Sequence, residues 1–231
     1  MAQPKFSAVT NPTPNSVVDA RVKPNAELQL LIGGPYTQDG EEHRYGHTAL
    51  RVKTARNDVT YDFGRYGEIT GTFHDGGEGI LRVWTNFNSY IRGENMLKRV
   101  TTAFVYSVFA EQANAVTDEA ALMMRAGKPR PDLERGRDGL KVYRLNTPYV
   151  ALSNNCTTLS MDLIKRGIPH IDEGSQKFIK PDLVMSWSER AAMNSVGGGT
   201  PGRIFLPANL REFLSTKPSI KVDRIDTYGG K

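Results

Sequence analysis

The sequence predicts an α+β domain in which an antiparallel sheet packs against a helix that carries the only cysteine of the chain. Runs of alternating polarity, rich in β-branched and aromatic residues, predict strands in the first half of the chain. Two segments, 110–126 and 154–167, have instead the composition and end signals of helices. Because no internal repeat and no second hydrophobic core stand out, we expect a single α+β domain.

The elements are predicted in this order. Residues 27–33 form a strand that ends in a Gly-Gly-Pro turn, and a polar loop follows. Segments 47–54 and 58–67 alternate in polarity across a three-residue gap, which predicts an antiparallel hairpin. After a glycine-rich loop over 70–79, segments 80–87 and 96–109 are two further strands. Helix is the competing interpretation of 96–109, but its valines and threonines favour strand.

The second half of the chain is predicted to be mainly helical. Helix 110–126 is closed by Gly127, and a loop then leads to a strand at 140–145 and to the cysteine helix. Beyond it the chain is irregular, with short helical stretches near 181–194 and 207–215. We therefore divide the chain into an extended N-terminal arm (1–25) and one domain (26–231), with a core of about 28–168 and a C-terminal extension, 169–231.

Composition limits the classes of function. The 231 residues are 39% hydrophobic and 24% charged, as in globular proteins. No apolar run approaches the roughly 18–20 residues of a transmembrane segment. The first 25 residues lack the apolar centre of a signal peptide, so we expect synthesis in the cytoplasm and any export through a specialised secretion system.

The net charge of +5 is spread along the chain, and no nucleic-acid motif is present, so we expect no nucleic-acid partner. The charge suits weak attraction to a polyanion such as a cell wall, or simply a solubilising surface. A single cysteine excludes an intramolecular disulfide and a cysteine-based metal cluster. His43 and His47 share a face only on a helix, and the segment predicts a turn into a strand, so we expect no metal and no cofactor.

Cys156 is predicted to lie at the start of its helix. Asn154 or Asn155 is a good N-cap, and Cys156 then falls in the first turn, on the apolar face that also carries Leu159 and Leu163. At this position the helix dipole and free backbone N–H groups stabilise a thiolate, and the same donors can hold an oxyanion. The alternative is a buried structural cysteine that acts as a small hydrophobic side chain.

A cysteine nucleophile needs a base and a group that orients the base. His47 opens a strand directly after Gly46, a small residue that leaves room beside it, and Asp62 lies on the next strand of the hairpin. Depending on register, the pairing brings these two side chains together on one face. The alternatives are a hydrogen-bonded strand histidine and a surface carboxylate. His74, in the glycine-rich loop, and His170 are poorer candidates for the base.

Together these motifs resemble the circularly permuted papain-like group. Gly46–His47 on a strand, the following YDFG strand, and a later strand that leads into NNCTTLS are similar to that group, which includes permuted NlpC-type peptidases, lecithin retinol acyltransferase-like proteins and PPPDE-type isopeptidases. His47 precedes Cys156 by 109 residues, which fits the permuted order. The resemblance covers roughly residues 28–168.

The resemblance implies a permuted papain-like fold and roles for particular residues. Cys156 would be the nucleophile, His47 the base and Asp62 the orienting group. Asn155 would belong to the oxyanion site, and Tyr45 and Tyr61 would line the site.

The resemblance also implies acyl hydrolysis or transfer through a thiolate acyl-enzyme. We expect cleavage of amide bonds in bacterial peptidoglycan peptides by an endopeptidase or amidase. The basic charge suits an anionic wall. The unstructured N-terminal arm and the missing signal peptide resemble those of small antibacterial effectors exported by the type VI secretion system, whose partners would be the secretion apparatus and an immunity protein. The alternatives are a cysteine acyltransferase or lipase, a protease with another substrate, and an inactive binding module.

Overall fold

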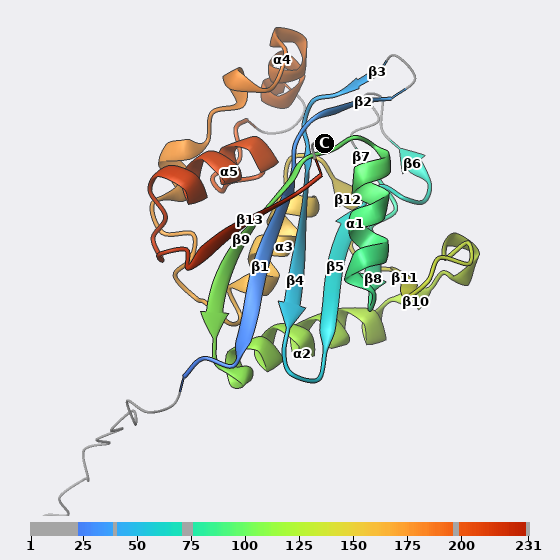
Figure 1. Cartoon of the computed structure of the whole chain (residues 1–231). Helices are drawn as coiled ribbons and strands as arrows, with labels where there is room; N and C mark the ends of the chain where they lie inside the picture. The colour runs from blue at the N-terminus through green and yellow to red at the C-terminus, as the bar shows by residue number, and fades with distance from the viewer. Residues whose placement is uncertain (1–22, 39–40, 71–75, 196–198, 230–231) are drawn as a thin grey trace, which may run out of the picture.

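The computed structural model describes residues 23–38, 41–70, 76–195 and 199–229. Its centre is an eight-stranded sheet in which every neighbouring pair is antiparallel (Figure 1). The sheet order is β10 (Lys128–Pro129), β11 (Leu140–Arg144), β8 (Ile80–Trp84), β5 (Asp58–Gly64), β4 (His47–Lys53), β1 (Ala26–Gly33), β9 (Thr101–Val108) and β13 (Arg224–Tyr228). Helices pack on this sheet, so the predicted α+β class with a large antiparallel sheet is confirmed.

The predicted hairpin is confirmed as β4 and β5, in a register that sets Ala49 opposite Asp62. The helix predicted over 110–126 is α2 (Ala110–Ala126), and the cysteine helix is α3 (Cys156–Ile164). Helix α3 ends three residues before Gly167, because its last turn tightens into hydrogen bonds from Arg166 and Gly167 to carbonyls three residues back.

Helix α1 (Phe87–Met96) was not predicted, and it shortens two predicted strands. The strand predicted over 80–87 ends at Trp84, because Asn86 accepts a hydrogen bond from the Ser89 N–H and so caps a helix. The strand predicted over 96–109 is confirmed only from Thr101, since Met96 is the last residue of α1. The threonine- and valine-rich part of that segment is strand rather than helix, as predicted.

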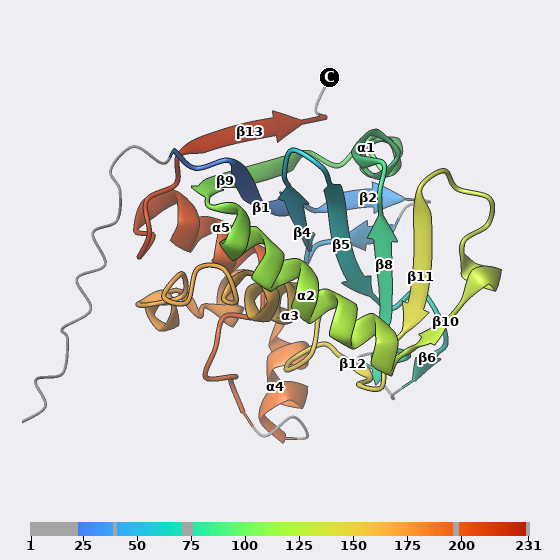
Figure 2. The same ribbon diagram turned by 90° about the horizontal axis from the view of Figure 1, so that it is seen from below.

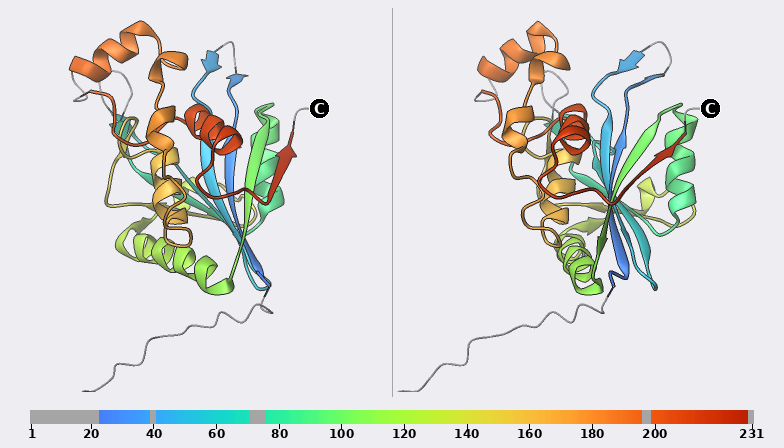
Figure 3. Two further views of the ribbon diagram at one scale, coloured as in Figure 1. Left: turned by 90° about the vertical axis from the view of Figure 1, so that its left-hand side faces the viewer. Right: turned by 60° about the vertical axis from the view of Figure 1, so that its left-hand side comes forward.

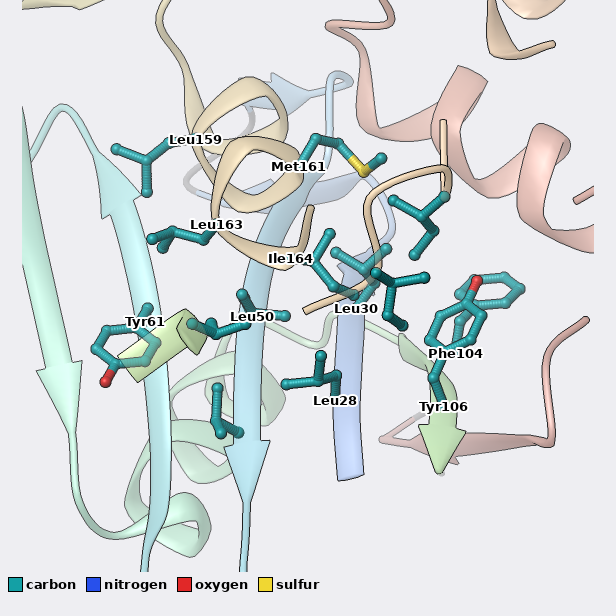
Figure 4. Close-up of a cluster of buried hydrophobic side chains, with 14 of the residues drawn as sticks. Leu28, Leu30, Leu50, Tyr61, Phe104, Tyr106, Leu159, Met161, Leu163 and Ile164 are labelled. Carbon is teal, nitrogen blue, oxygen red and sulfur yellow. The ribbon is translucent and has the colours of Figure 1, made fainter. Parts of the chain in front are cut away.

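One face of the sheet is covered by α2, α3 and α5 (Pro207–Thr216), as Figures 2 and 3 show. The strands contribute alternate side chains to a buried cluster on this face, including Leu28, Leu30 and Leu50, and α3 packs Leu163 and Ile164 onto them (Figure 4). All residues of α3 except Asp162 are buried. Burial of nearly the whole helix fixes the position of its N-terminus against β4 and β5.

The opposite face carries a second buried cluster, which includes Leu31, Ala49 and Trp84, and α1 covers it with Tyr90 (Figures 2 and 3). Both faces of the sheet are therefore buried, whereas the sequence indicated one core. The second cluster was missed because α1, the helix that covers it, was not predicted.

The C-terminal part adds more structure than was predicted. Helix α4 (Trp187–Ser195) and α5 occur where helical stretches were expected, but β13, at one edge of the sheet, was not predicted. Phe213 of α5 is buried in the same cluster as the strands, so the core extends beyond residue 168. The polar loop before His47 contains a small hairpin of β2 (Tyr36–Gln38) and β3 (Glu41–His43).

Three smaller strands form a separate sheet at one end of the molecule, in the order β12 (Tyr149–Val150), β7 (Gly76–Gly77) and β6 (Ile69–Thr70). The predicted arm falls largely on residues 1–22, which lie outside the described residues, as does His74. Among the described residues, no helix combines the length and hydrophobicity needed to cross a lipid bilayer.

Gly46 is a backbone constraint directly before His47. Its φ is +72°, and a Cβ placed on it would lie 2.5 Å from the carbonyl oxygen of Gly33. We expect Gly46→Ala to lower the free energy of unfolding by about 2–4 kcal/mol, the sum of left-handed strain and a backbone clash. Denaturant titration of the purified variant measures this loss. Gly136→Ala is the matched control, because Gly136 has a φ of +63° with no atom near its Cβ position. Equal losses at the two positions would contradict the clash.

Candidate active site

Cys156 occupies the first turn of α3, and Asn155 rather than Asn154 is the N-cap. The Asn155 side chain accepts a hydrogen bond from the Thr158 N–H at 3.0 Å, and the Thr158 hydroxyl accepts one from the Asn155 N–H at 2.8 Å. This reciprocal pair fixes the helix start. Cys156 is 6% exposed and lines a cleft of about 1380 Å³. The sulfur is thus held at the positive end of the helix dipole and still reaches the cleft.

His47 and Asp62 meet as the hairpin register allows. Ala49 lies opposite Asp62, which makes His47 the diagonal neighbour of Asp62 on the same face of the sheet. His47 Nε2 lies 2.6 Å from Asp62 Oδ1. Both residues are buried. The contact leaves Nδ1 as the ring nitrogen that is not committed to the carboxylate.

Asp62 has two further partners that the sequence analysis missed. Arg82, directly opposite it on β8, donates from Nε to Asp62 Oδ2 at 2.7 Å and also from Nη2. The Tyr66 hydroxyl donates to Asp62 Oδ1 at 2.9 Å. Burial alone would raise the pKa of Asp62, but Arg82 and His47 outweigh it and hold the pKa well below its usual range. An arginine inside the apolar segment ILRVW was the available signal for Arg82.

Cys156 reaches His47 from the other side of the sheet. Helix α3 packs on the face of the sheet opposite to the one that carries His47 and Asp62. Cys156 and His47 are the first residues of α3 and β4, so they approach each other at the end of the sheet where both elements begin. Cys156 and His47 are close enough that each shifts the pKa of the other through its charge and through hydrogen bonding, and the Thr48 N–H also acts on the pKa of the thiol. Thr48 also ties the two elements together, because its hydroxyl lies 3.1 Å from that of Thr157.

These contacts shift both pKa values toward the ion pair. Burial alone would raise the pKa of the Cys156 thiol, but the charge and hydrogen bond of His47 lower it below its ordinary value. Burial alone would lower the pKa of His47, but the attraction of Asp62 and Cys156 raises it to about 10. At pH values between the two pKa values, the pair is therefore a thiolate and an imidazolium.

The side chain of Asn155 does not serve as an oxyanion donor. Its amide nitrogen donates to the carbonyl oxygens of Ala151 and Phe205, and its oxygen accepts from Thr158. Its backbone N–H is also engaged by Thr158. The Cys156 N–H, by contrast, has no hydrogen-bond acceptor within the described part of the chain. The side-chain amide and the backbone N–H of Asn155 are thus all engaged in hydrogen bonds within the protein.

The two tyrosines singled out from the sequence lie in different places. Tyr45 lines the cleft and donates a hydrogen bond to Glu189 of α4. Tyr61 does not line the cleft, because it precedes Asp62 on β5 and so points to the opposite face, into the core cluster with Leu50 (Figure 4). Tyr149, which was not predicted, lines the cleft together with Cys156. Burial and the charge of Cys156 both raise its pKa.

The chain matches no family model, no curated protein and no solved structure. The geometry of the site is therefore the basis for assigning a function.

The state of the sulfur can be measured directly, because Cys156 is the only cysteine. We expect alkylation by iodoacetamide to rise with pH through a midpoint below about 8.5, the ordinary thiol value. In His47→Ala the cation is lost while burial remains, so the midpoint moves above that value. A shift of one pH unit or more would slow alkylation at pH 7 by at least about tenfold. Intact-mass spectrometry follows the reaction, and His170→Ala, at an exposed histidine, is the control. Equal midpoints in wild type and His47→Ala would contradict the ion pair.

The Arg82–Asp62 pair can be tested through stability. Arg82→Met leaves a buried carboxylate without its cation, and we expect a loss of about 3–5 kcal/mol at pH 7. Because the pKa of Asp62 is depressed in the folded state, its stabilising contribution is present above the ordinary pKa of about 3.9 and is lost as the pH falls. The difference between wild type and Arg82→Met should therefore shrink below about pH 4. Denaturant titrations at several pH values measure it, and a difference that does not depend on pH would contradict this account.

Proposed function

We propose that the protein is a cysteine hydrolase that cleaves amide bonds through a thioester acyl-enzyme. The observation that carries the proposal is the chain of contacts from Asp62 through His47 to Cys156, with 2.6 Å between Asp62 Oδ1 and His47 Nε2. A nucleophile, a base and a group that orients the base are the three parts that covalent catalysis of this kind requires. Cys156 and His47 line an open cleft, which gives a substrate access to the sulfur.

The proposed mechanism assigns a step to each group. The Cys156 thiolate attacks the carbonyl carbon of the amide, and the Cys156 N–H at the helix N-terminus stabilises the oxyanion. His47, protonated and held by Asp62, gives its proton to the departing amine as the C–N bond breaks. His47 then takes a proton from water as the water attacks the thioester. The products are a carboxylic acid and an amine, and the thiolate–imidazolium pair is restored.

We infer further that this hydrolase belongs to the circularly permuted papain-like group. Three features support the assignment: a cysteine at the tip of a helix on an antiparallel sheet, a histidine at the start of a strand, and the histidine preceding the cysteine in the chain. The position of Asp62 on the strand next to His47 agrees with it.

The substrate that we propose is a peptide of bacterial peptidoglycan. The basic charge of the chain suits an anionic wall, and the cleft has room for several residues of an extended peptide. Action as an antibacterial toxin with an immunity partner remains a prediction from the sequence. The alternatives are a lipid acyltransferase or lipase and a protease acting on another protein. A non-catalytic module is disfavoured by the contact between the thiol and an imidazole of raised pKa.

Purified sacculi test this function. We expect wild-type protein to release soluble peptides whose masses reveal new carboxyl and amino groups, and Cys156→Ala to reduce the release by at least about a thousandfold, as loss of a nucleophile does. His47→Ala should approach the same loss. Circular dichroism and denaturant titration check that the variants are folded, and His170→Ala is the active control.

Phospholipid vesicles and ubiquitin-like conjugates are incubated in parallel. Release of fatty acid or of free ubiquitin-like protein, with intact sacculi, would favour the alternative substrates. Equal activity in wild type and Cys156→Ala would contradict a cysteine hydrolase of any kind.

A further inference from the structure

Arg65 lines the same cleft as Cys156. It follows the last residue of β5, its side chain is exposed, and its guanidinium carbon lies 5.6 Å from the centre of the Tyr149 ring. Tyr149 and Cys156 line the same cleft as Arg65, and the charge of Cys156 raises the pKa of the Tyr149 hydroxyl. Within the described ranges, no carboxylate forms an ion pair with Arg65.

The carboxylates that line the cleft already have partners. Glu94 accepts from Arg99 Nη1 at 2.6 Å in a buried ion pair. Glu189 accepts from Tyr45 and from the Ser186 hydroxyl and N–H. These carboxylates are therefore not available to neutralise Arg65.

The remaining charges of the cleft do not cancel that of Arg65. Asp138 accepts a hydrogen bond from Asn86, while Arg92 and Arg137 line the cleft with exposed side chains. Neither of these arginines pairs with a carboxylate in the part of the chain that the structure describes. The cleft therefore presents uncompensated positive charge, and Arg65 is a cation of the cleft that lies near the Tyr149 ring.

We propose that Arg65 binds a carboxylate of the substrate beside the scissile amide, which makes the enzyme selective for acidic peptides. This inference rests on the proposed amide hydrolysis and names the chemistry that the site selects. The planar guanidinium offers paired donors to a carboxylate, and stacking near Tyr149 restricts its motion. A neutral or cationic group at the same position in a substrate would leave Arg65 without a partner.

Alkylation of Cys156 tests the local charge without any assumption about the substrate. Iodoacetate carries a carboxylate and iodoacetamide does not, while both form the same thioether bond and release iodide. We expect Arg65→Gln to lower the ratio of the two rates by about three- to tenfold at low salt, mainly by slowing iodoacetate, as for one unit charge acting over roughly 10 Å. Arg65→Lys should retain most of the ratio. Arg56→Gln, at an exposed arginine in the β4–β5 turn, is the control and should leave it unchanged.

The second arm uses sacculi whose peptide carboxylates have been converted to carboxamides with carbodiimide and ammonium. We expect wild-type protein to cleave these at least about tenfold more slowly than untreated sacculi, while Arg65→Gln cleaves both at the same low rate. Equal cleavage of both by wild type, or an unchanged alkylation ratio in Arg65→Gln, would overturn the role of Arg65 but leave the hydrolase intact.

If wild type releases nothing from sacculi, the proposed substrate fails, and the alkylation ratio still decides whether Arg65 draws anions to the sulfur. Faster hydrolysis of anionic phospholipid vesicles than of sacculi would overturn selectivity for acidic peptides.

Discussion

The carboxylate of Asp62 is completely buried, and much of the architecture around the cleft follows from the need to keep it ionised. An isolated carboxylate in a protein interior is costly enough that it would take up a proton instead. Here one oxygen receives the Arg82 guanidinium, and the other receives His47 and Tyr66. His47 comes from β4, Arg82 from β8 and Tyr66 from the segment after β5, the strand that carries Asp62. A slip of one residue between neighbouring strands would turn one partner to the opposite face, so the carboxylate also selects the register of the sheet.

The pKa of Cys156 is linked to Asp62 through His47, although Cys156 and Asp62 belong to opposite faces of the sheet. Asp62 keeps His47 charged, and the charged imidazole lowers the pKa of the thiol against the effect of burial. The link is made where α3 and β4 both begin, and Thr48 contacts both the sulfur and Thr157. The near-complete burial of α3 matters for this reason, since a helix free to shift by even one ångström would break a contact with the imidazole.

The parts that could be predicted from sequence were those with local signals. The asparagine pair before Cys156 predicted a capped helix start, and alternation in 47–54 and 58–67 predicted the hairpin that joins His47 to Asp62. Arg82 and Tyr66 were missed because their roles depend on which strand lies next to β5, which no local pattern specifies. Tyr61 lies in the core rather than in the cleft because it is adjacent to Asp62 on β5, and adjacent residues of a strand point to opposite faces. Helix α1 escaped detection because it is short and contains Asn88, Gly93 and Asn95, residues with low helix propensity, although its apolar residues pack on one side.

A second buried ion pair offers an internal comparison for the candidate site. Glu94 and Arg99 are as buried as the Asp62 network and nearly as close, with 2.6 Å between Arg99 Nη1 and Glu94 Oε2. They join the end of α1 to the start of β9 and contact neither the imidazole nor the thiol among the interactions of the described residues. A buried ion pair is therefore not in itself a sign of catalysis, since such pairs also order packed segments. The Asp62 network differs because Asp62 stabilises the charged form of His47, a side chain that can transfer a proton. His47 in turn acts on Cys156, the only cysteine and so the only residue able to form a thioester. A buried carboxylate that acts through an imidazole on a reactive atom in an open cleft is the arrangement that catalysis requires, whereas a purely structural ion pair has no such reactive atom beside it.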